Sequence, residues 1–122
     1  NLVYAENGKL KRRVPGWPNE RGRAPENWLA YLDEKDWGIG IFTPGTEMFT
    51  CYRFKGNGGK GSGGSACSYV APLRRFSLQK GIKIDYEVFL TIGSINEIRD
   101  RFALLKKRLN TQSAKPEPKI QP

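Results

Sequence analysis

The side chains with the clearest chemical potential in this sequence are acidic. Asp33, Glu34 and Asp36 lie together at an expected turn, and Asp85 and Glu87 alternate along an expected strand. Pairs of carboxylates carry out glycoside hydrolysis when they lie roughly 5–10 Å apart across the scissile bond. Acidic residues are also common in turns, where they are well solvated and accept hydrogen bonds from nearby backbone. We therefore interpret both groups as structural and assign no catalytic residue.

The rest of the composition also argues against an enzyme. The 122 residues include no histidine and only two cysteines. The absence of histidine excludes Ser-His-Asp and Cys-His nucleophiles, imidazole acid–base steps and metal sites with an imidazole ligand. Two cysteines are too few for a four-thiolate zinc site. We expect no metal site and no cofactor, and the composition favours a binding or structural module.

Cys51 and Cys67 are candidates for a disulfide. They are symmetric about Gly59, which lies in a glycine-rich stretch. In a simple hairpin centred on that glycine the two side chains would face each other, close enough to bridge if their geometry permits. A bridge enclosing about 15 residues would stabilise the fold by on the order of 3 kcal/mol in the chain-entropy model. Two small, free, buried thiols are the alternative.

The charge balance is basic, with 21 Lys and Arg against 12 Asp and Glu, a formal net charge of +9. Such an excess favours acidic partners, which include nucleic acid, an anionic membrane surface and an acidic polysaccharide. It also serves solubility alone. The excess is concentrated near the two ends of the chain, in residues 9–23 and 98–109.

Five residues form the candidate ligand-binding surface. Trp17 lies in a basic loop rich in proline, Tyr52 precedes Arg53, and Arg74 and Arg75 follow an expected strand. Exposed aromatic rings beside arginine suit the apolar C–H faces of sugars, and they suit unstacked nucleic-acid bases equally. The guanidinium groups could pair with carboxylates or sulfates in bidentate geometry. In the structural alternative, Trp17 packs its loop against the domain and the arginines are solvated.

Alternation of apolar and polar residues, together with turn dipeptides, predicts a mainly β chain. The expected strands cover residues 1–6, 10–14, 28–33, 37–42, 48–55, 67–78 and 82–92. Prolines in residues 15–25 exclude a helix or a central strand there. The last strand has the cleanest alternation and carries Leu90 on its apolar face, so Leu90→Ala is expected to cost roughly 2–5 kcal/mol.

Two strands form an expected hairpin centred on Lys35. This centre places Tyr31 opposite Ile39 on one face, and it brings Gly38 and Gly40 together on the other face. Two glycines on one face of a strand leave a shallow trough that another backbone, an aromatic ring or a ligand can approach closely. We favour core packing over ligand binding as the use of this trough.

A helix is expected after the last strand. Ser94 and Glu97 match a capping box. The residues that follow place an apolar stripe at steps of three and four, as a helix lying on a sheet requires; the stripe consists of Ile95, Ile98, Phe102, Leu105 and Leu109. We predict a domain over residues 1–109 and a disordered tail or linker over residues 110–122, which are polar and contain three prolines. The fold class is therefore an antiparallel β-sandwich or curved sheet of six to seven strands with one C-terminal helix.

Three segments, in order, resemble a known group of proteins. They are Trp28-Leu-Ala-Tyr-Leu-Asp-Glu-Lys-Asp-Trp-Gly-Ile-Gly-Ile-Phe-Thr-Pro44, Cys67-Ser-Tyr-Val-Ala-Pro-Leu73 and Tyr86-Glu-Val-Phe-Leu-Thr-Ile-Gly93. This series is similar to β-sandwich segments of large secreted proteins in polysaccharide-degrading bacteria, which accompany glycoside hydrolase or polysaccharide lyase modules. The resemblance implies a β-sandwich, a glycan setting and an extracytoplasmic location. It carries no catalytic residue that could be transferred.

Taken together, these observations predict a non-catalytic, carbohydrate-associated module that binds, or supports the binding of, polysaccharide, with acidic glycans suited to its charge. One alternative is a module for single-stranded nucleic acid, although no RRM, KH or zinc-finger signature is present. Another is a structural support domain for a neighbouring catalytic domain. We also expect a neighbouring domain or partner chain to cover the sheet edges, and we expect no membrane span, since no apolar run is long enough. The chain begins at Asn1 without a signal-like sequence, so we expect either a processed mature form or a domain of a longer protein. The small sheet with edges to protect favours the domain of a longer protein.

Overall fold

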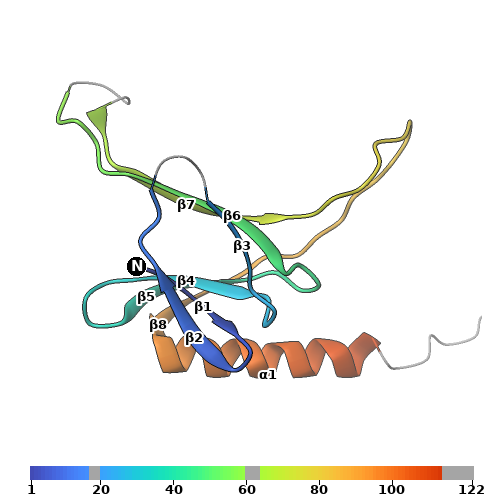
Figure 1. Ribbon diagram of the computed structural model, residues 1–122. Coiled ribbons are helices and arrows are strands. Elements are labelled where there is room, and N and C mark those ends of the chain that lie inside the picture. The colour runs from blue at the N-terminus through green and yellow to red at the C-terminus, as the bar shows by residue number, and fades with distance from the viewer. Residues whose placement is uncertain (17–19, 60–63, 114–122) are drawn as a thin grey trace, which may run out of the picture.

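The computed structural model describes residues 1–16, 20–59 and 64–113. Within these ranges the chain forms eight strands and one helix (Figure 1). In chain order they are β1 (Leu2–Glu6), β2 (Lys9–Arg13), β3 (Glu20–Arg23), β4 (Trp28–Leu32), β5 (Trp37–Phe42), β6 (Met48–Phe54), β7 (Cys67–Leu73), β8 (Phe89–Ser94) and α1 (Ile95–Ser113).

The strands form two antiparallel sheets. A five-stranded sheet has the order β2-β1-β4-β5-β8, and a three-stranded sheet has the order β3-β6-β7. The helix lies along one side of the five-stranded sheet, and the three-stranded sheet lies on its other side (Figure 1). The predicted mainly β, sandwich-like fold with a C-terminal helix is therefore confirmed, with eight strands in place of six or seven. The additional strand, β3, falls in the proline-rich segment and occupies a sheet edge, where neighbouring prolines are tolerated.

The first hydrophobic core lies between α1 and the five-stranded sheet. The backbone N–H of Glu97 donates to Ser94 Oγ over 3.3 Å, and Ser94 Oγ donates to Glu97 Oε1 over 3.1 Å, as the capping box predicts. The predicted apolar stripe packs inward. The fully enclosed members of this core come from β1, β4, β5 and α1: Val3, Ala5, Trp28, Ala30, Leu32, Phe42, Ile95, Ile98 and Phe102.

The predicted hairpin register is confirmed, because Tyr31 pairs with Ile39 and Leu32 pairs with Gly38. The glycine trough of β5 is filled by the helix. A Cβ atom at Gly40 would lie only 2.5 Å from Ile98 Cγ2. Gly40 therefore serves core packing, as favoured from the sequence, whereas a Cβ at Gly38 would collide with the backbone carbonyl of Tyr31 in β4.

The second core lies between the two sheets. Its buried members are Leu2, Tyr4, Ala24, Leu29, Phe49 and Cys51. Tyr31 of β4 reaches across to the smaller sheet, where its hydroxyl donates to the carbonyl of Tyr69 over 2.7 Å. Burial raises the pKa of Tyr31 to about 12. The hydroxyl therefore stays protonated and acts as a donor that joins the two layers.

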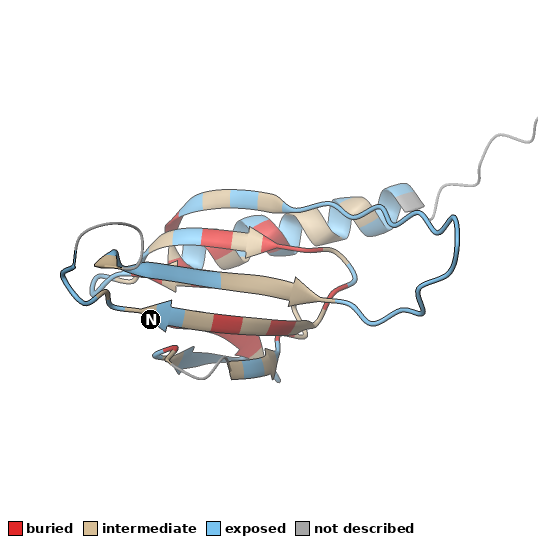
Figure 2. Cartoon of the chain, turned by 90° about the horizontal axis from the view of Figure 1, so that it is seen from above, coloured by how far each residue is buried: buried red, intermediate tan, exposed pale blue. Residues whose placement is uncertain are grey.

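The main difference from the prediction concerns the expected strand over residues 82–92. Its regular part begins only at Phe89, and residues 74–88 form an exposed, extended loop, here called the arm (Figure 2). Leu90, expected in the core, is 69% exposed, because Phe89 and Thr91 are the residues of β8 that turn toward the helix. The expected cost of 2–5 kcal/mol for Leu90→Ala is therefore wrong. Alternation along a strand defines an apolar face, but it does not establish that another layer covers that face.

The C-terminal boundary also differs from the prediction. The helix continues to Ser113, so the first four residues of the expected tail, 110–113, are helical. Asn110, Thr111 and Gln112 are polar and exposed, so this last turn needs no apolar partner. The rest of the expected tail, residues 114–122, lies outside the described residues.

Candidate functional site

The five candidate ligand residues do not form one surface. Trp17 lies outside the described residues. Arg53 pairs with Ser68 at one end of the β6–β7 hairpin, while Arg74 and Arg75 follow Leu73, which pairs with Met48 at the other end. Five residues of strand separate the two ends, or roughly 17 Å at 3.3–3.4 Å per residue. The structure thus places Tyr52 and Arg53 in one region, and Arg74 and Arg75 in another.

Tyr52 belongs to the outer face of the three-stranded sheet. Its ring lies beside that of Tyr69, directly across the strand pair, with 5.6 Å between ring centroids and 42° between ring planes. Arg21 of β3 lies on the same face, because it is paired with Thr50, two residues before Tyr52. This face combines two aromatic rings with a basic edge.

Arg53 lies in a different setting. It borders a shallow hollow with the N-terminal residue and the β4–β5 turn; the other lining residues are Asn1, Leu32, Asp33, Glu34 and Lys35. The two carboxylates of this lining lie among the cations of Lys35, Arg53 and the N-terminal ammonium group, so the charges of this hollow are mixed.

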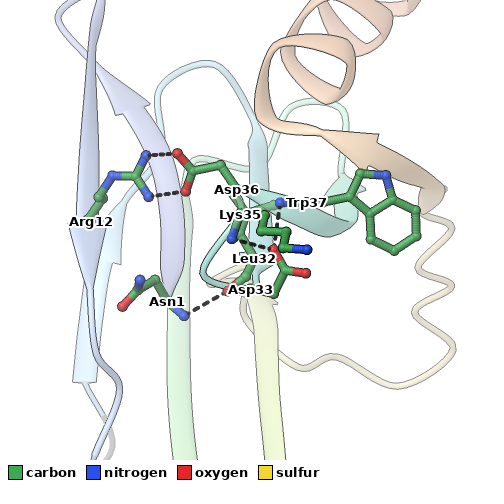
Figure 3. A network of polar contacts seen from close by, with 7 residues as sticks. All are labelled: Asn1, Arg12, Leu32, Asp33, Lys35, Asp36 and Trp37. Atoms are coloured by element: carbon green, nitrogen blue, oxygen red, sulfur yellow. Dashed lines mark hydrogen bonds and ion pairs between the residues drawn. The ribbon is translucent and has the colours of Figure 1, made fainter.

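The carboxylates of that turn have structural roles (Figure 3). Asp33 Oδ1 accepts hydrogen bonds from the backbone N–H groups of Lys35 and Trp37, at 2.8 and 3.1 Å. Asp36 accepts two bonds from the guanidinium of Arg12, at 2.6 and 2.7 Å. These bonds lower the pKa of Asp36 below its usual value. The two carboxylates hold the turn in shape and join it to β2, as the structural interpretation predicted.

Arg74 lines a mostly apolar cleft at the base of the arm. Its Nε donates to Thr46 Oγ1 over 3.0 Å, and its Nη2 donates to the carbonyl of Pro44 over 3.3 Å. These two bonds orient the guanidinium at the base of the arm. The cleft beside it has a volume of about 490 Å³, within the ordinary range for small-molecule sites. We call it the Arg74 cleft.

The walls of the Arg74 cleft are mostly apolar and aromatic. They come from the end of β5, from β7 and from both sides of the arm, and comprise Thr43, Thr46, Ala71, Pro72, Leu73, Arg74, Phe76, Ile84 and Tyr86. Tyr86 is 68% exposed, so its ring is accessible from outside. An oriented cation among apolar walls is the usual composition of a site that binds one charged, partly apolar ligand.

Thr43 is a buried polar residue in the wall of this cleft. The residue is only 4% exposed, and its Oγ1 makes no hydrogen bond to the described residues. Buried hydroxyls nearly always have a partner, because leaving one unsatisfied costs about 1–3 kcal/mol. Because this oxygen is itself enclosed, it lies behind the cleft surface and does not face a bound ligand.

Arg75 lies on the other side of the arm base. It borders a second concavity of about 570 Å³ together with Arg74 and Lys83. Glu47 and Asp85 line the same concavity, so its charges are mixed. Arg74 is shared between the two concavities and is the only one of the five candidate residues that also lines an apolar cleft among the described residues.

The candidate disulfide between Cys51 and Cys67 is absent, and both thiols are free. The hairpin register pairs Cys51 with Val70 and Cys67 with Phe54, so the two cysteines are offset by three positions. Because an odd offset places side chains on opposite faces of a sheet, Cys51 faces the core and Cys67 faces outward. The disulfide alternative assumed a turn centred on Gly59, and the observed register does not have that centre.

Sequence reasoning missed Thr43, Phe76 and Tyr86 as cleft residues. Phe76 follows Arg74-Arg75 directly, which was a usable signal. Tyr86 belonged to the apolar stripe of an expected strand and was therefore assigned to packing. Nothing in the sequence around Thr43 distinguishes it from an ordinary turn residue.

Among the described residues, no group of three or more cysteine or carboxylate side chains could hold a metal ion. No helix in those ranges combines the length and apolar character needed to cross a bilayer. Comparison of the chain with family models, curated proteins and solved structures gave no match.

Proposed function

We propose that this chain is a non-catalytic, carbohydrate-associated module that binds an acidic glycan in the Arg74 cleft. The observation that carries the proposal is the oriented guanidinium of Arg74 in a cleft walled by Phe76 and the exposed ring of Tyr86. The resemblance to β-sandwich segments of secreted glycan-degrading proteins supports the same ligand class. It also supports an extracytoplasmic location within a larger protein of that kind.

Each part of the cleft suits one part of an acidic sugar. The apolar C–H face of a sugar ring can stack on Tyr86, while a carboxylate or sulfate pairs with the guanidinium of Arg74 in a charge-assisted hydrogen bond. The net charge of +9 attracts anionic polymers from a distance and favours an acidic over a neutral glycan.

Calorimetry with uronic, sulfated and neutral oligosaccharides of equal length tests the proposal. We expect binding of an acidic oligosaccharide that weakens as salt rises, because exposed charges are screened beyond about 8–10 Å at physiological ionic strength. Arg74→Met should lower affinity by about tenfold or more, which corresponds to about 1.4 kcal/mol, and should flatten the salt dependence. Tyr86→Ala should lower affinity at every salt concentration.

Arg53→Met is the matched control, since it removes the same charge from an exposed position at the other end of the β6–β7 hairpin. It should leave affinity almost unchanged. No heat with any oligosaccharide, or equal losses for Arg74→Met and Arg53→Met, would contradict binding in the cleft.

A specific observation favours a second candidate, a module for single-stranded nucleic acid. The paired rings of Tyr52 and Tyr69, with Arg21 on the same sheet face, resemble the stacking platforms that bind unstacked bases. A titration with single-stranded DNA separates the two functions. Tight binding that Tyr69→Ala weakens and Arg74→Met does not would favour nucleic acid over the glycan.

A further inference from the structure

One half of the five-stranded sheet carries an uncovered apolar surface. The three-stranded sheet packs over β1 and β4, where Leu2, Tyr4 and Leu29 are buried. The same face continues across β5 and β8, but its side chains there are 51–69% exposed. We call these residues the apolar ledge: Trp37, Ile39, Leu90 and Ile92. Exposed apolar residues gathered on one sheet face indicate an interaction surface.

The arm extends this surface beyond the sheet. Its alternate residues Ile82, Ile84, Tyr86 and Val88 are all exposed, although they are apolar. Between residues 74 and 88, all of which are described, the backbone makes one backbone–backbone hydrogen bond, from the N–H of Ile82 to the carbonyl of Gln79. The arm leads directly into β8, which is an edge strand of the sheet. Residues 82–94 thus present one long, alternating strand with an unpaired edge, which is a template for strand addition.

We propose that residues 82–94 pair antiparallel with the same residues of a second copy of this chain, about a two-fold axis. An isologous contact needs a surface that is complementary to itself. A strand with alternating apolar and polar residues meets this requirement. When such a strand pairs antiparallel with its own copy, the apolar faces of both strands lie on one side of the pair and the polar faces lie on the other side. This inference does not depend on the proposed glycan binding.

The apolar face selects the class of register. Residues directly opposite each other in an antiparallel pair point to the same face. With Val88 on the axis, Tyr86 of one copy lies opposite Leu90 of the other, and Ile84 lies opposite Ile92. The ledge of each copy then continues into the arm of the other copy. An axis between two residues would instead set apolar side chains beside charged ones.

The opposite face brings charged side chains of the arm beside α1 of the other copy. With Val88 on the axis, Asp85 lies opposite Thr91, whose Oγ1 accepts a hydrogen bond from Arg101 Nη1 over 3.1 Å. Lys83 lies opposite Gly93, where a Cβ would lie 3.1 Å from Arg101 Nη1 and 3.2 Å from Glu97 Oε2, so Lys83 meets both partners of the Glu97–Arg101 ion pair. Asp85 is therefore the arm residue that gains an opposite charge nearby, while Glu87 lies opposite Phe89.

The axis at Val88 is also favoured over its two neighbours. With the axis at Glu87, the two copies place like carboxylates directly side by side, which is destabilising. With the axis at Phe89, Ile84 lies opposite Ser94, so apolar side chains face each other over a shorter stretch. The register centred on Val88 avoids facing carboxylates and pairs apolar side chains from Ile84 to Ile92.

Light scattering and sedimentation across a range of protein concentrations, without any glycan, test the proposal. We expect a concentration-dependent dimer. Val88→Lys places two ammonium groups together at the axis and should give a monomer with unchanged circular dichroism, since Val88 lies outside both cores. Leu78→Lys is the matched control: the residue is an exposed apolar side chain of the same arm outside the pairing segment, and the variant should stay dimeric.

A charge exchange tests the contact between the arm and α1 of the other copy. Asp85→Arg should weaken the dimer by like-charge repulsion with Arg101, and adding Arg101→Asp should restore it. A monomer at every concentration, a dimer unaffected by Val88→Lys, or no restoration in the double variant would overturn the proposal. Arg74→Met should leave the dimer intact, so failure of the dimer and failure of glycan binding are separate results.

Discussion

Arg99 of α1 donates two hydrogen bonds to Glu26, the residue two positions before β4. The distances are 3.1 Å from Nε to Oε1 and 2.8 Å from Nη2 to Oε2. The indole N–H of Trp28 donates to the same Oε1 over 3.1 Å. Arg99 also reaches the carbonyl of Gly8 in the β1–β2 turn. One arginine of the basic C-terminal segment thus connects the helix to two parts of the sheet.

This contact makes stability depend on pH. The hydrogen bonds from Arg99 lower the pKa of Glu26 below its usual value, against an opposing effect of burial. The stabilisation is therefore present above the ordinary pKa of a glutamate and is lost as pH falls through the lowered value. Urea unfolding at pH 7 and at pH 3 should show a smaller difference for Glu26→Gln than for the original chain.

Glu34→Gln is the control for this measurement, because Glu34 is exposed at the β4–β5 turn. It should keep the original pH dependence. At pH 7 Glu26→Gln should lower the free energy of unfolding by about 1–2 kcal/mol. This value is in the lower part of the range for hydrogen bonds to charged groups, because the side chains of Glu26 and Arg99 are both about one-third exposed to solvent. An identical pH dependence in the two variants would contradict the role of Glu26.

Local patterns in the sequence predicted the parts of the fold that depend on nearby residues. The Ser94–Glu97 capping box and the Tyr31–Ile39 register follow from spacing within a few residues. The position of the three-stranded sheet does not follow from such local spacing. It covers Leu29 and leaves Leu90 exposed, although both residues lie in apolar alternation. The strands that carry Leu29 and Leu90 have equivalent apolar alternation in the sequence. Contacts between distant strands decide which of the two apolar faces becomes covered, and a single sequence does not show those contacts.

The packing of the helix into β5 leads to the next prediction. Gly40→Ala should destabilise the fold by about 1–3 kcal/mol, the usual cost of adding a methyl group to a filled core. The added Cβ would lie 2.5 Å from Ile98 Cγ2 and 2.9 Å from Phe102 Cε2. Gly16→Ala is the control, since a Cβ there has no neighbour within 4 Å among the described atoms. Thermal unfolding of the two variants should differ clearly, and equal midpoints would show that the trough is not filled as described.

The helix itself offers a matched pair of truncations. Ile98 is fully buried in the core, whereas Leu104 is half exposed on the same helix. Ile98→Ala should cost about 2–5 kcal/mol, because it removes buried methyl groups and leaves a cavity. Leu104→Ala should change stability by less than about 0.5 kcal/mol. Chemical unfolding measures both, and similar losses at the two positions would mean that the helix presents a different face to the sheet.

The candidate site was harder to predict than the fold, because its residues also meet through contacts between distant segments of the chain. Arg74 was identified from its residue type, but Thr43 and Tyr86 join it only because the end of β5 and the arm meet beside β7. Tyr52 and Arg53 were grouped with Arg74 because they are close to aromatic or basic neighbours in the sequence. The β6–β7 register separates them, because residues at opposite ends of a hairpin cannot share a small ligand.

The two cysteines provide the last prediction. Cys67 is exposed and Cys51 is buried between the sheets, where burial raises the pKa of its thiol. Because the thiolate is the reactive form, Cys67 should react rapidly with a thiol reagent in the folded protein while Cys51 reacts slowly. In denaturant without reductant both should react, and mass measurement should show no missing hydrogens. Cys67→Ser should remove the fast phase, and Cys51→Ser should leave it unchanged. Equal protection of both thiols, or a mass two hydrogens low, would contradict the opposite orientation of the two side chains across the β6–β7 hairpin.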